Sequence, residues 1–362
     1  MAAAAALDRA RDFAMPAISI VLPVFDRRNV GWRSLASALA QDFPHDDYEV
    51  IVVVGRDGAS LDADPLARAL LAGCDRVVRT DLDTGDVASE AALYAAGVAE
   101  ARGDWVMFME GHTALEADCC RTIDAYVRAH PHATMAWAPR FNHDTTPLGS
   151  LVTLHNLRHE RRAATAGTFS LGANSIIRRD ALARFGGFDP RYQRFAETAI
   201  LRRARAAGVA IGRIDRPLAT HFNDMDVAHW RALVMQMGEA KHAYYAMLRA
   251  RGDDLRGQVR HPAYRLAFRP MWARVLRPLF RFGGATMLRV ALAARPLSER
   301  LASTLYVPAV GFTDLAGYCR ARAAAVEAER TRHAVSSARA ASSGRAATLR
   351  YSEQSDARDN DR

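Results

Sequence analysis

Two continuous apolar runs near the N-terminus restrict the fold of this 362-residue chain more than any other feature. The first is AISIVLPVF at residues 17–25 and the second is YEVIVVV at residues 48–54. Neither run alternates apolar with polar residues, so each predicts a strand buried on both faces, as in a parallel sheet covered by helices. Trp32, Leu35 and Leu39 recur at helical spacing between the two runs. The chain therefore begins as strand, helix, strand.

The same alternation continues for roughly another 80 residues and predicts an α/β fold. The expected elements are a strand at Arg76–Arg79, a helix at Ser89–Ala101, a strand at Trp105–Met109, a helix at Ala117–Ala129 and a strand at Thr134–Ala138. Gly103 and Asp104 mark the turn that precedes the third of these. We therefore predict a mainly parallel sheet flanked by helices within residues 16–230.

The pattern changes to helices at Asp226, beginning with a helix at Val227–Arg251. Arginine-punctuated apolar stretches follow, and four prolines are expected to break them into short pieces (Pro262, Pro270, Pro278 and Pro296). We therefore divide the chain into an N-terminal extension (1–15), an α/β domain (16–230), a helical basic region (231–319) and a tail (320–362). The tail is rich in Ala, Arg and Ser, and its end is expected to be largely disordered.

Charge is distributed unevenly between these regions. Residues 1–230 carry 26 Arg and 29 acidic residues, a net charge of −3, whereas residues 231–362 carry 23 basic and 11 acidic residues, a net charge of +12. The C-terminal region is therefore the part expected to meet an anionic surface. No nucleic-acid recognition motif accompanies the arginines, so we expect no nucleic-acid partner.

The cellular setting follows from what the sequence lacks. No uncharged stretch is near the ~20 residues that a spanning helix needs, and the N-terminus does not resemble a secretion signal. The four cysteines (Cys74, Cys119, Cys120 and Cys319) show no zinc-binding spacing, and we expect reduced thiols. We predict a cytoplasmic protein that associates peripherally with the inner face of the cell membrane.

Polar residues follow four of the expected strands. Asp26 follows the first strand and Asp57 follows the second; Glu110 and His112 follow WVMFM, and His221 ends the last segment of the α/β domain. In an open α/β sheet, ligands bind at the carboxyl ends of the strands. These residues are therefore expected to line one site.

The order of these segments resembles a family 2 glycosyltransferase with the GT-A fold. The resemblance covers residues 16–225 and is strongest in GVAEARGDWVMFMEGH and in LGANSIIRRDALARFGGFD. It implies a GT-A-like catalytic domain that transfers a sugar from a nucleotide-sugar donor to an acceptor hydroxyl with inversion. A Gln-x-x-Arg-Trp motif, which marks processive members, has no match at residues 236–240. A single-addition enzyme is therefore expected.

The family's metal-binding Asp-x-Asp is replaced here by Glu110-Gly111-His112. A carboxylate and an imidazole can share a cation, and imidazole suits Mn²⁺ better than Mg²⁺. Because the resemblance also places a histidine near the metal at His221, these three residues are expected to form a mixed site for a divalent cation. The alternative is that Glu110 and His112 hydrogen-bond the donor diphosphate or cap a helix without metal.

The family's acidic pair is altered to Glu197-Thr198. Inverting transfer needs one carboxylate to accept the proton of the attacking hydroxyl, and the resemblance assigns that role to Glu197. The resemblance also implies that Asp26 and Asp57 bind the nucleotide, together with Glu110 and His112. Asp189 is expected to be a turn or helix cap.

Two other functions remain open at this stage. Because two motifs are substituted, the domain could be catalytically degenerate and bind a nucleotide sugar or a partner without turnover. A nucleotidyltransferase is the weaker alternative, because it would need a glycine-rich loop after the first strand, and the chain there has Asp26-Arg27-Arg28-Asn29, which contains no glycine. The acceptor is expected to be a saccharide, a lipid-linked sugar or a small molecule, and the sequence does not discriminate among these.

Overall fold

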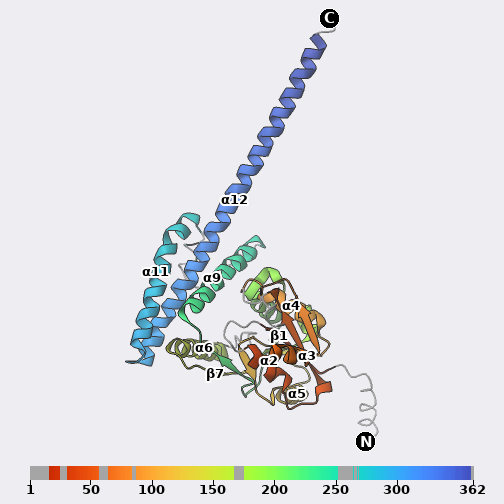
Figure 1. Ribbon diagram of the computed structural model, residues 1–362, viewed down its shortest axis with the longest axis vertical. Coiled ribbons are helices and arrows are strands. Elements are labelled where there is room, and N and C mark those ends of the chain that lie inside the picture. The colour runs from red at the N-terminus through yellow and green to blue at the C-terminus, as the bar shows by residue number, and fades with distance from the viewer. Residues whose placement is uncertain are drawn as a thin grey trace.

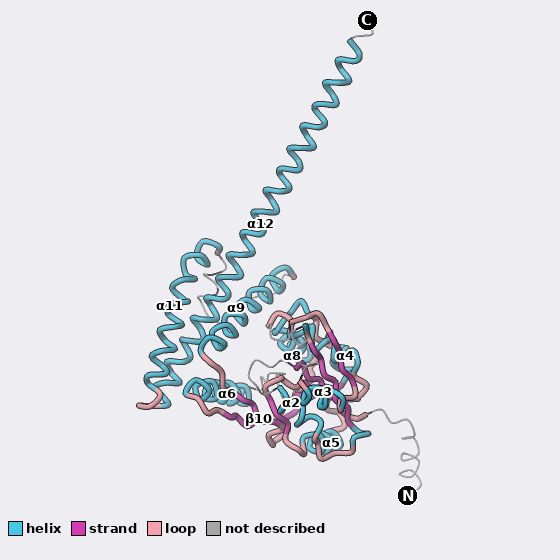
Figure 2. The backbone as a smooth tube through the Cα atoms, viewed as in Figure 1, coloured by secondary structure: helices cyan, strands magenta, loops and turns pink. Residues whose placement is uncertain are grey.

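The computed structural model describes residues 16–24, 31–56, 64–83, 87–166, 175–251, 264, 267 and 269–359, with side chains as far as Arg332. An α/β domain is formed by the N-terminal part of the chain, and three long helices follow it (Figure 1). The last of these helices extends well beyond the remainder of the molecule (Figure 2). The predicted α/β class with a helical C-terminal region is confirmed.

The main sheet has seven strands in the order β3-β2-β1-β4-β8-β6-β9. Its parallel core consists of β1 (Ile18–Val24), β2 (Tyr48–Val54), β3 (Arg76–Arg79) and β4 (Trp105–Phe108). β8 (Ser175–Arg178) is antiparallel to both of its neighbours, β4 and β6 (Met135–Trp137), and β9 (Gly212–Arg213) is parallel to β6. Every residue of β1 and β2 is buried, as their continuous apolar sequences predict.

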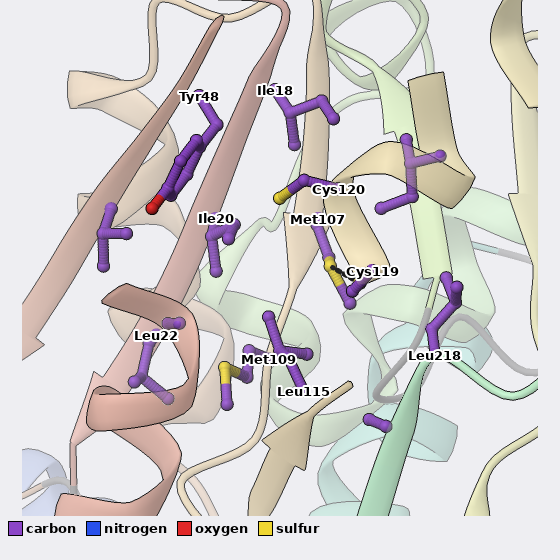
Figure 3. Packing of buried hydrophobic residues seen from close by; sticks show 14 of the residues in the cluster. Ile18, Ile20, Leu22, Tyr48, Met107, Met109, Leu115, Cys119, Cys120 and Leu218 are labelled. Carbon is purple, nitrogen blue, oxygen red and sulfur yellow. Dashed lines mark hydrogen bonds between the residues drawn. The ribbon is translucent and has the colours of Figure 1, made fainter. Parts of the chain in front are cut away.

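Alternate residues of these strands enter two separate cores. Ile18, Ile20 and Leu22 face α2 (Gly31–Leu39), α3 (Pro65–Ala72) and α5 (Cys119–Ala129), and Figure 3 shows them beside Met107, Cys119 and Cys120. Val21, Ile51 and Phe108 face the opposite core, which α4 (Glu90–Glu100), α7 (Arg179–Arg184) and α8 (Ala196–Ala206) cover. The two-residue period of a strand therefore supplies apolar side chains to both faces. All four cysteines are free thiols, as expected.

A buried carboxylate fixes the turn that leads into β4. Glu49 accepts hydrogen bonds from Ser19 Oγ at 2.6 Å and from the backbone N–H groups of Arg102 and Gly103 at 2.6 and 3.2 Å. A Cβ atom on Gly103 would lie only 2.7 Å from the backbone nitrogen of Ser19. The turn therefore requires glycine, and it sets the register from which β4 delivers the next residues to the site.

A second sheet, in the order β5-β10-β7, lies at the end of the domain that carries the site. It contains β5 (Thr113–Leu115), β10 (Ala219–Phe222) and β7 (Phe141–His143). β10 is antiparallel to β5, so that His221 is paired with Thr113. α6 (Pro147–Ala166) follows β7, and the 3-10 helices η1 (His45–Asp47) and η3 (Pro190–Phe195) also belong to this domain.

The C-terminal region contains α9 (Val227–Ala250), α11 (Pro270–Ala294) and α12 (Glu299–Asp359). The prediction that prolines keep its helices short is wrong for Pro278, which lies inside α11, whereas Pro270 begins that helix and Pro262 lies outside the described residues. Pro308, for which no break was predicted, lies inside α12. Each proline inside a helix removes one helical hydrogen bond, at a cost of about 3 kcal/mol, which the long buried contact between α11 and α12 offsets. Among the described helices, none combines the length and the apolar character that crossing a membrane demands.

The predicted domain boundaries fall within helices. α9 runs through residues 230 and 231, and α12 runs through residues 319 and 320 into the Ala/Arg/Ser-rich tail as far as Asp359. Trp230 at the start of α9 packs with Leu148 and Leu151 of α6, and its Nε1 donates to Tyr306 Oη of α12 at 2.6 Å. The helices are therefore fastened to the α/β domain, and the division into domains stays a prediction.

Two glycines let the backbones of α9 and α12 come into direct contact. A Cβ atom on Gly238 would lie 1.9 Å from the carbonyl oxygen of Asp314, and one on Gly317 would lie 2.0 Å from that of Met235. Gly311, on α12, has no atom within 4 Å of the corresponding position.

We predict that Gly238→Ala and Gly317→Ala each destabilise the protein, because a methyl group would force the two backbones apart. The expected loss is roughly 1–3 kcal/mol, as for other overpacked contacts. Gly311→Ala is the matched control and is expected to leave stability unchanged or to raise it by up to ~1 kcal/mol through helix propensity. Thermal unfolding of the three variants measures this, and equal midpoints for all three would contradict the close crossing.

Candidate functional site

The site begins where β4 ends. After Phe108 and Met109 the chain reaches Glu110, turns at Gly111 and enters β5. Thr113 holds this turn through its backbone N–H and its Oγ1, which donate to the Glu110 carbonyl at 3.0 and 2.9 Å. Ser34 Oγ of α2 donates to the Gly111 carbonyl at 3.0 Å, and Tyr94 Oη of α4 donates to the Met109 carbonyl at 3.2 Å. The short segment is therefore anchored from both faces of the sheet.

Pairing of β5 with β10 brings His221 to this turn. The backbone N–H of Phe222 donates to the His112 carbonyl at 3.0 Å. The next residue, Asn223, is fully buried and donates to Asn142 Oδ1 and to Thr153 Oγ1 at 2.9 and 2.8 Å. These bonds tie β10 to β7 and α6, so the position of His221 is fixed on both sides.

The result is a compact cluster of one carboxylate and two imidazoles. Glu110 Oε2 lies 3.2 Å from His112 Nε2 and 3.3 Å from His221 Nε2, and the two Nε2 atoms are 2.8 Å apart. Glu110 and His112 side chains are each 13 % exposed, and His221 is buried. Within the described part of the chain, this is the one group of three or more His, Cys, Asp or Glu side chains with metal-site spacing.

The electrostatics of the cluster favour an ionised carboxylate. Burial by itself would raise the pKa of Glu110, but the imidazoles of His112 and His221 and the guanidinium of Arg140 hold that pKa well below its ordinary value. Arg140 follows β6 and is paired with Glu160 of α6 at 2.9 Å. The cluster thus combines a negative carboxylate with two ring nitrogens within 3.3 Å of it.

These three residues fit a divalent transition cation. Glu110 Oε2 is buried without an aligned hydrogen-bond donor, although both Nε2 atoms lie within 3.3 Å of it. A carboxylate with two imidazoles is a donor set that suits Mn²⁺ better than the harder Mg²⁺. Three donor atoms converging from the turn between β4 and β5 and from β10 leave further coordination positions for substrate oxygens.

A second acidic group lies beside this cluster. Glu197 is partly buried in the first turn of α8, and Arg194 of η3 lies three residues before it. The guanidinium of Arg194 pairs with Glu90, at the start of α4, with a distance of 2.8 Å. Glu90, Arg194 and Glu197 thus come from three separate elements.

The guanidinium of Arg194 acts on the carboxyl groups of both Glu90 and Glu197. Burial and the charge of Glu90 raise the pKa of Glu197 well above its ordinary value, and Glu110 adds to this effect while Arg194 opposes it. Burial also raises the pKa of Glu90, against the lowering effect of Arg194. A carboxylate with a raised pKa is a stronger base than one in water, and such perturbed groups gather at active sites.

Not all the predicted residues can be placed. Glu110, His112 and His221 come together, and Glu197 is electrostatically coupled to Glu110. Asp26 and Asp57, predicted to bind the nucleotide, lie outside the described residues. Thr198 is exposed, and Asp189 caps η3 by accepting from the backbone N–H of Arg191 at 3.0 Å, as predicted.

Sequence reasoning missed three charged residues of this region, Glu90, Arg194 and Arg140. Glu90 opens a helix and Arg140 follows a strand, positions at which charged residues are ordinary, so neither carried a signal of its own. The one available signal was the spacing of Arg194 three residues before Glu197, which puts a cation near a suspected base.

Comparison with known proteins identifies the family of this chain. The model of the family "Glycosyltransferase like family 2" matches residues 16–238, well over half of the chain. No curated protein sequence matches at a significant level.

Solved structures are similar over most of the chain. The mannosyltransferase PcManGT of Pyrobaculum calidifontis, in complex with GDP-Man and Mn²⁺, is 18 % identical with a TM-score of 0.51, over 86 % of each chain. S. aureus TarS 1–349, in complex with UDP, is 13 % identical with a TM-score of 0.42, over 86 % of this chain and 91 % of that one. The similarity to the mannosyltransferase supports the assignment of the fold. The family match and the GT-A fold together show that this chain belongs to the family 2-like glycosyltransferases.

Proposed function

We propose that this glycosyltransferase moves a sugar from a nucleotide-sugar donor to an acceptor hydroxyl by single addition with inversion at the anomeric carbon. The observation that carries the proposal is the electrostatic coupling between two groups, one that follows β4 and one in the first turn of α8. One is the Glu110, His112 and His221 cluster, and the other is the partly buried carboxyl of Glu197, which the charge of Glu110 influences. A cation-binding cluster beside a basic carboxylate is the arrangement that such a transfer needs.

The cluster would hold a divalent cation, Mn²⁺ or Mg²⁺, against the donor diphosphate. When bound, such a cation offsets the charge that develops on the nucleoside diphosphate leaving group. Within the chain, Glu110 supplies the anionic ligand, and the guanidinium of Arg140 favours its ionised form. The solved mannosyltransferase in complex with GDP-Man and Mn²⁺ has a similar fold, which supports a nucleotide sugar and a divalent cation as the bound molecules. Asp26 and Asp57 are proposed to bind the nucleotide.

Glu197 would accept the proton of the acceptor hydroxyl as its oxygen attacks the anomeric carbon. The raised pKa makes the ionised carboxylate a good proton acceptor. Arg194 and Glu90 would set that basicity, because their charges act on Glu197 in opposite directions. Thr198 has no ionisable group, so Glu197 performs this role without a second acid in the motif.

The lack of a processive motif supports single addition. Residues 236–240 instead provide Gly238, which allows the close crossing of α9 and α12. The alternative, a degenerate domain that only binds a nucleotide sugar, has less support, because it gives no reason for a partly buried carboxyl with a raised pKa that is coupled to the cluster. The acceptor would be a saccharide, a lipid-linked sugar or a small molecule. A cytoplasmic location at the inner face of the cell membrane is part of this proposal.

A nucleoside diphosphate is expected to bind more tightly with Mn²⁺ than with EDTA, and His112→Ala should remove most of that difference. The reason is that His112 contributes one of the three converging donor atoms. Thermal shift measures the effect, since a ligand that binds the folded state raises its stability by mass action. His132→Ala, which removes an exposed histidine, is the control. Equal affinity with and without Mn²⁺ would favour the metal-independent alternative.

Glu197→Gln should lower turnover ~10²–10⁴-fold, the usual contribution of a general base, while donor binding changes little. Turnover of a nucleotide sugar with an accepted substrate and thermal-shift titration of the donor measure the two quantities separately. Glu100→Gln, which changes an exposed glutamate at the end of α4, should leave both unchanged. Wild-type turnover in Glu197→Gln would rule out this base.

Stability should also depend on pH through Glu197. Because its pKa is raised in the folded state, its contribution to stability is present below the ordinary glutamate pKa and is lost as the pH rises through the folded value. Glutamine stays neutral, so the unfolding midpoint of Glu197→Gln relative to wild type should rise from pH 4 to pH 8. Unfolding in EDTA with Glu100→Gln as control tests this, and a pH-independent difference would contradict it.

A further inference from the structure

Within the described part of the chain, α11 presents to solvent an apolar stripe that no other element covers. Its four central members are highly exposed: Met271 at 65 %, Val275 at 58 %, Leu279 at 62 % and Phe282 at 75 %. They are spaced by four, four and three residues, so they share one face of a helix. Trp272, 38 % exposed, lies next to this face. The stripe is therefore a continuous surface and not a set of scattered side chains.

The orientation of this face is fixed by the opposite side of the helix. Ala273 and Phe280 are buried, and Leu276 packs against the same cluster, which includes Leu315 and Tyr318 of α12. α11 lies on the outer side of α12, away from the α/β domain (Figure 1). The aromatic residues of α11 do not share one face, because Phe280 is buried whereas Phe282 is exposed.

The charges on α11 are of one sign. The helix carries four arginines and no aspartate or glutamate. Arg274 and Arg281 lie at the edge of the stripe, and Arg289 follows Phe282 by seven residues, which places it on the same face. All three are exposed. Arg274 reaches Glu327 of α12 at 3.1 Å, an exposed pair that a stronger anionic partner can replace.

We propose that this face of α11 docks on an anionic lipid surface, with the helix lying in the plane of the interface. Apolar residues beside arginines are the pattern of helices that bind in this way. A second copy of the chain fits less well, because its own α11 offers no acidic residue to the arginines. The inference does not require the proposed sugar transfer, since it depends on surface chemistry alone.

Sedimentation of the full-length protein with vesicles of equal parts phosphatidylcholine and phosphatidylglycerol tests the proposal. Wild type should co-sediment at low ionic strength, and the charge-dependent part of binding should be lost near 1 M salt, where the Debye length is ~3 Å. Each arginine near such a surface contributes about fivefold in binding, so Arg281→Gln with Arg289→Gln should weaken it about 25-fold. Leu279→Gln with Phe282→Gln should weaken it at least about tenfold.

Matched controls lie on α3 of the α/β domain, where Leu66 is 56 % exposed and Arg68 is also exposed. Leu66→Gln with Arg68→Gln should bind vesicles as wild type does. Wild-type protein that stays in the supernatant at low salt would overturn the proposal, as would an equal loss in the α3 variant. Light scattering tests whether a second copy of the chain occupies the stripe instead. A wild-type dimer that becomes a monomer in Leu279→Gln with Phe282→Gln would assign the stripe to a second copy and overturn the proposal. Donor binding, measured in parallel, reports separately on the catalytic site.

Discussion

The short antiparallel pairing of β10 with β5 is the interaction on which the functional site depends. The pairing joins only three residues of each strand, yet it brings His221 to within 3.3 Å of a carboxylate more than a hundred residues earlier in the chain. Buried hydrogen bonds from Asn223 to β7 and α6 hold β10 in this register. A slip of one residue would turn His221 to the opposite face of the strand and remove it from the cluster.

The charges around the site form a balanced set. Three carboxyl groups (Glu90, Glu110 and Glu197) influence one another, and two arginines (Arg140 and Arg194) act on them. The two imidazoles stabilise the charge of Glu110, whereas burial and the charges of Glu90 and Glu110 raise the pKa of Glu197 more than Arg194 lowers it. The same buried region therefore maintains one acid as a stable anion and another as a strong base, which is how environment divides roles between like residues.

The helical region is joined to the α/β domain by packing and not by a flexible linker. Trp230 and Tyr306 meet α6 in one buried cluster, and Tyr244 and Leu248 of α9 enter the core behind the sheet. Lys241, the one lysine of the chain, pairs with Asp314 and contacts Tyr264, so α9 and α12 are also joined by charge. α11 packs its inner face against α12, so its exposed stripe lies on the outside of the helical region. The orientation of the stripe relative to the site is therefore fixed.

The sequence alone determined the fold class and the chemical identity of the metal-binding candidates. Continuous apolar runs at β1 and β2 required burial on both faces, and strand ends placed Glu110, His112 and His221 at one edge. Tertiary structure decided the rest. Glu90 and Arg140 carry no local signal, and Arg194 shows only its spacing from Glu197, because the influence of these residues on Glu197 and Glu110 arises only when α4, η3 and the end of β6 meet in space. Packing likewise decided the effect of Pro278 and the exposure of Phe282. The sequence predicts that Pro278 removes a helical hydrogen bond, but only the assembled helices show which face of α11 is covered by α12.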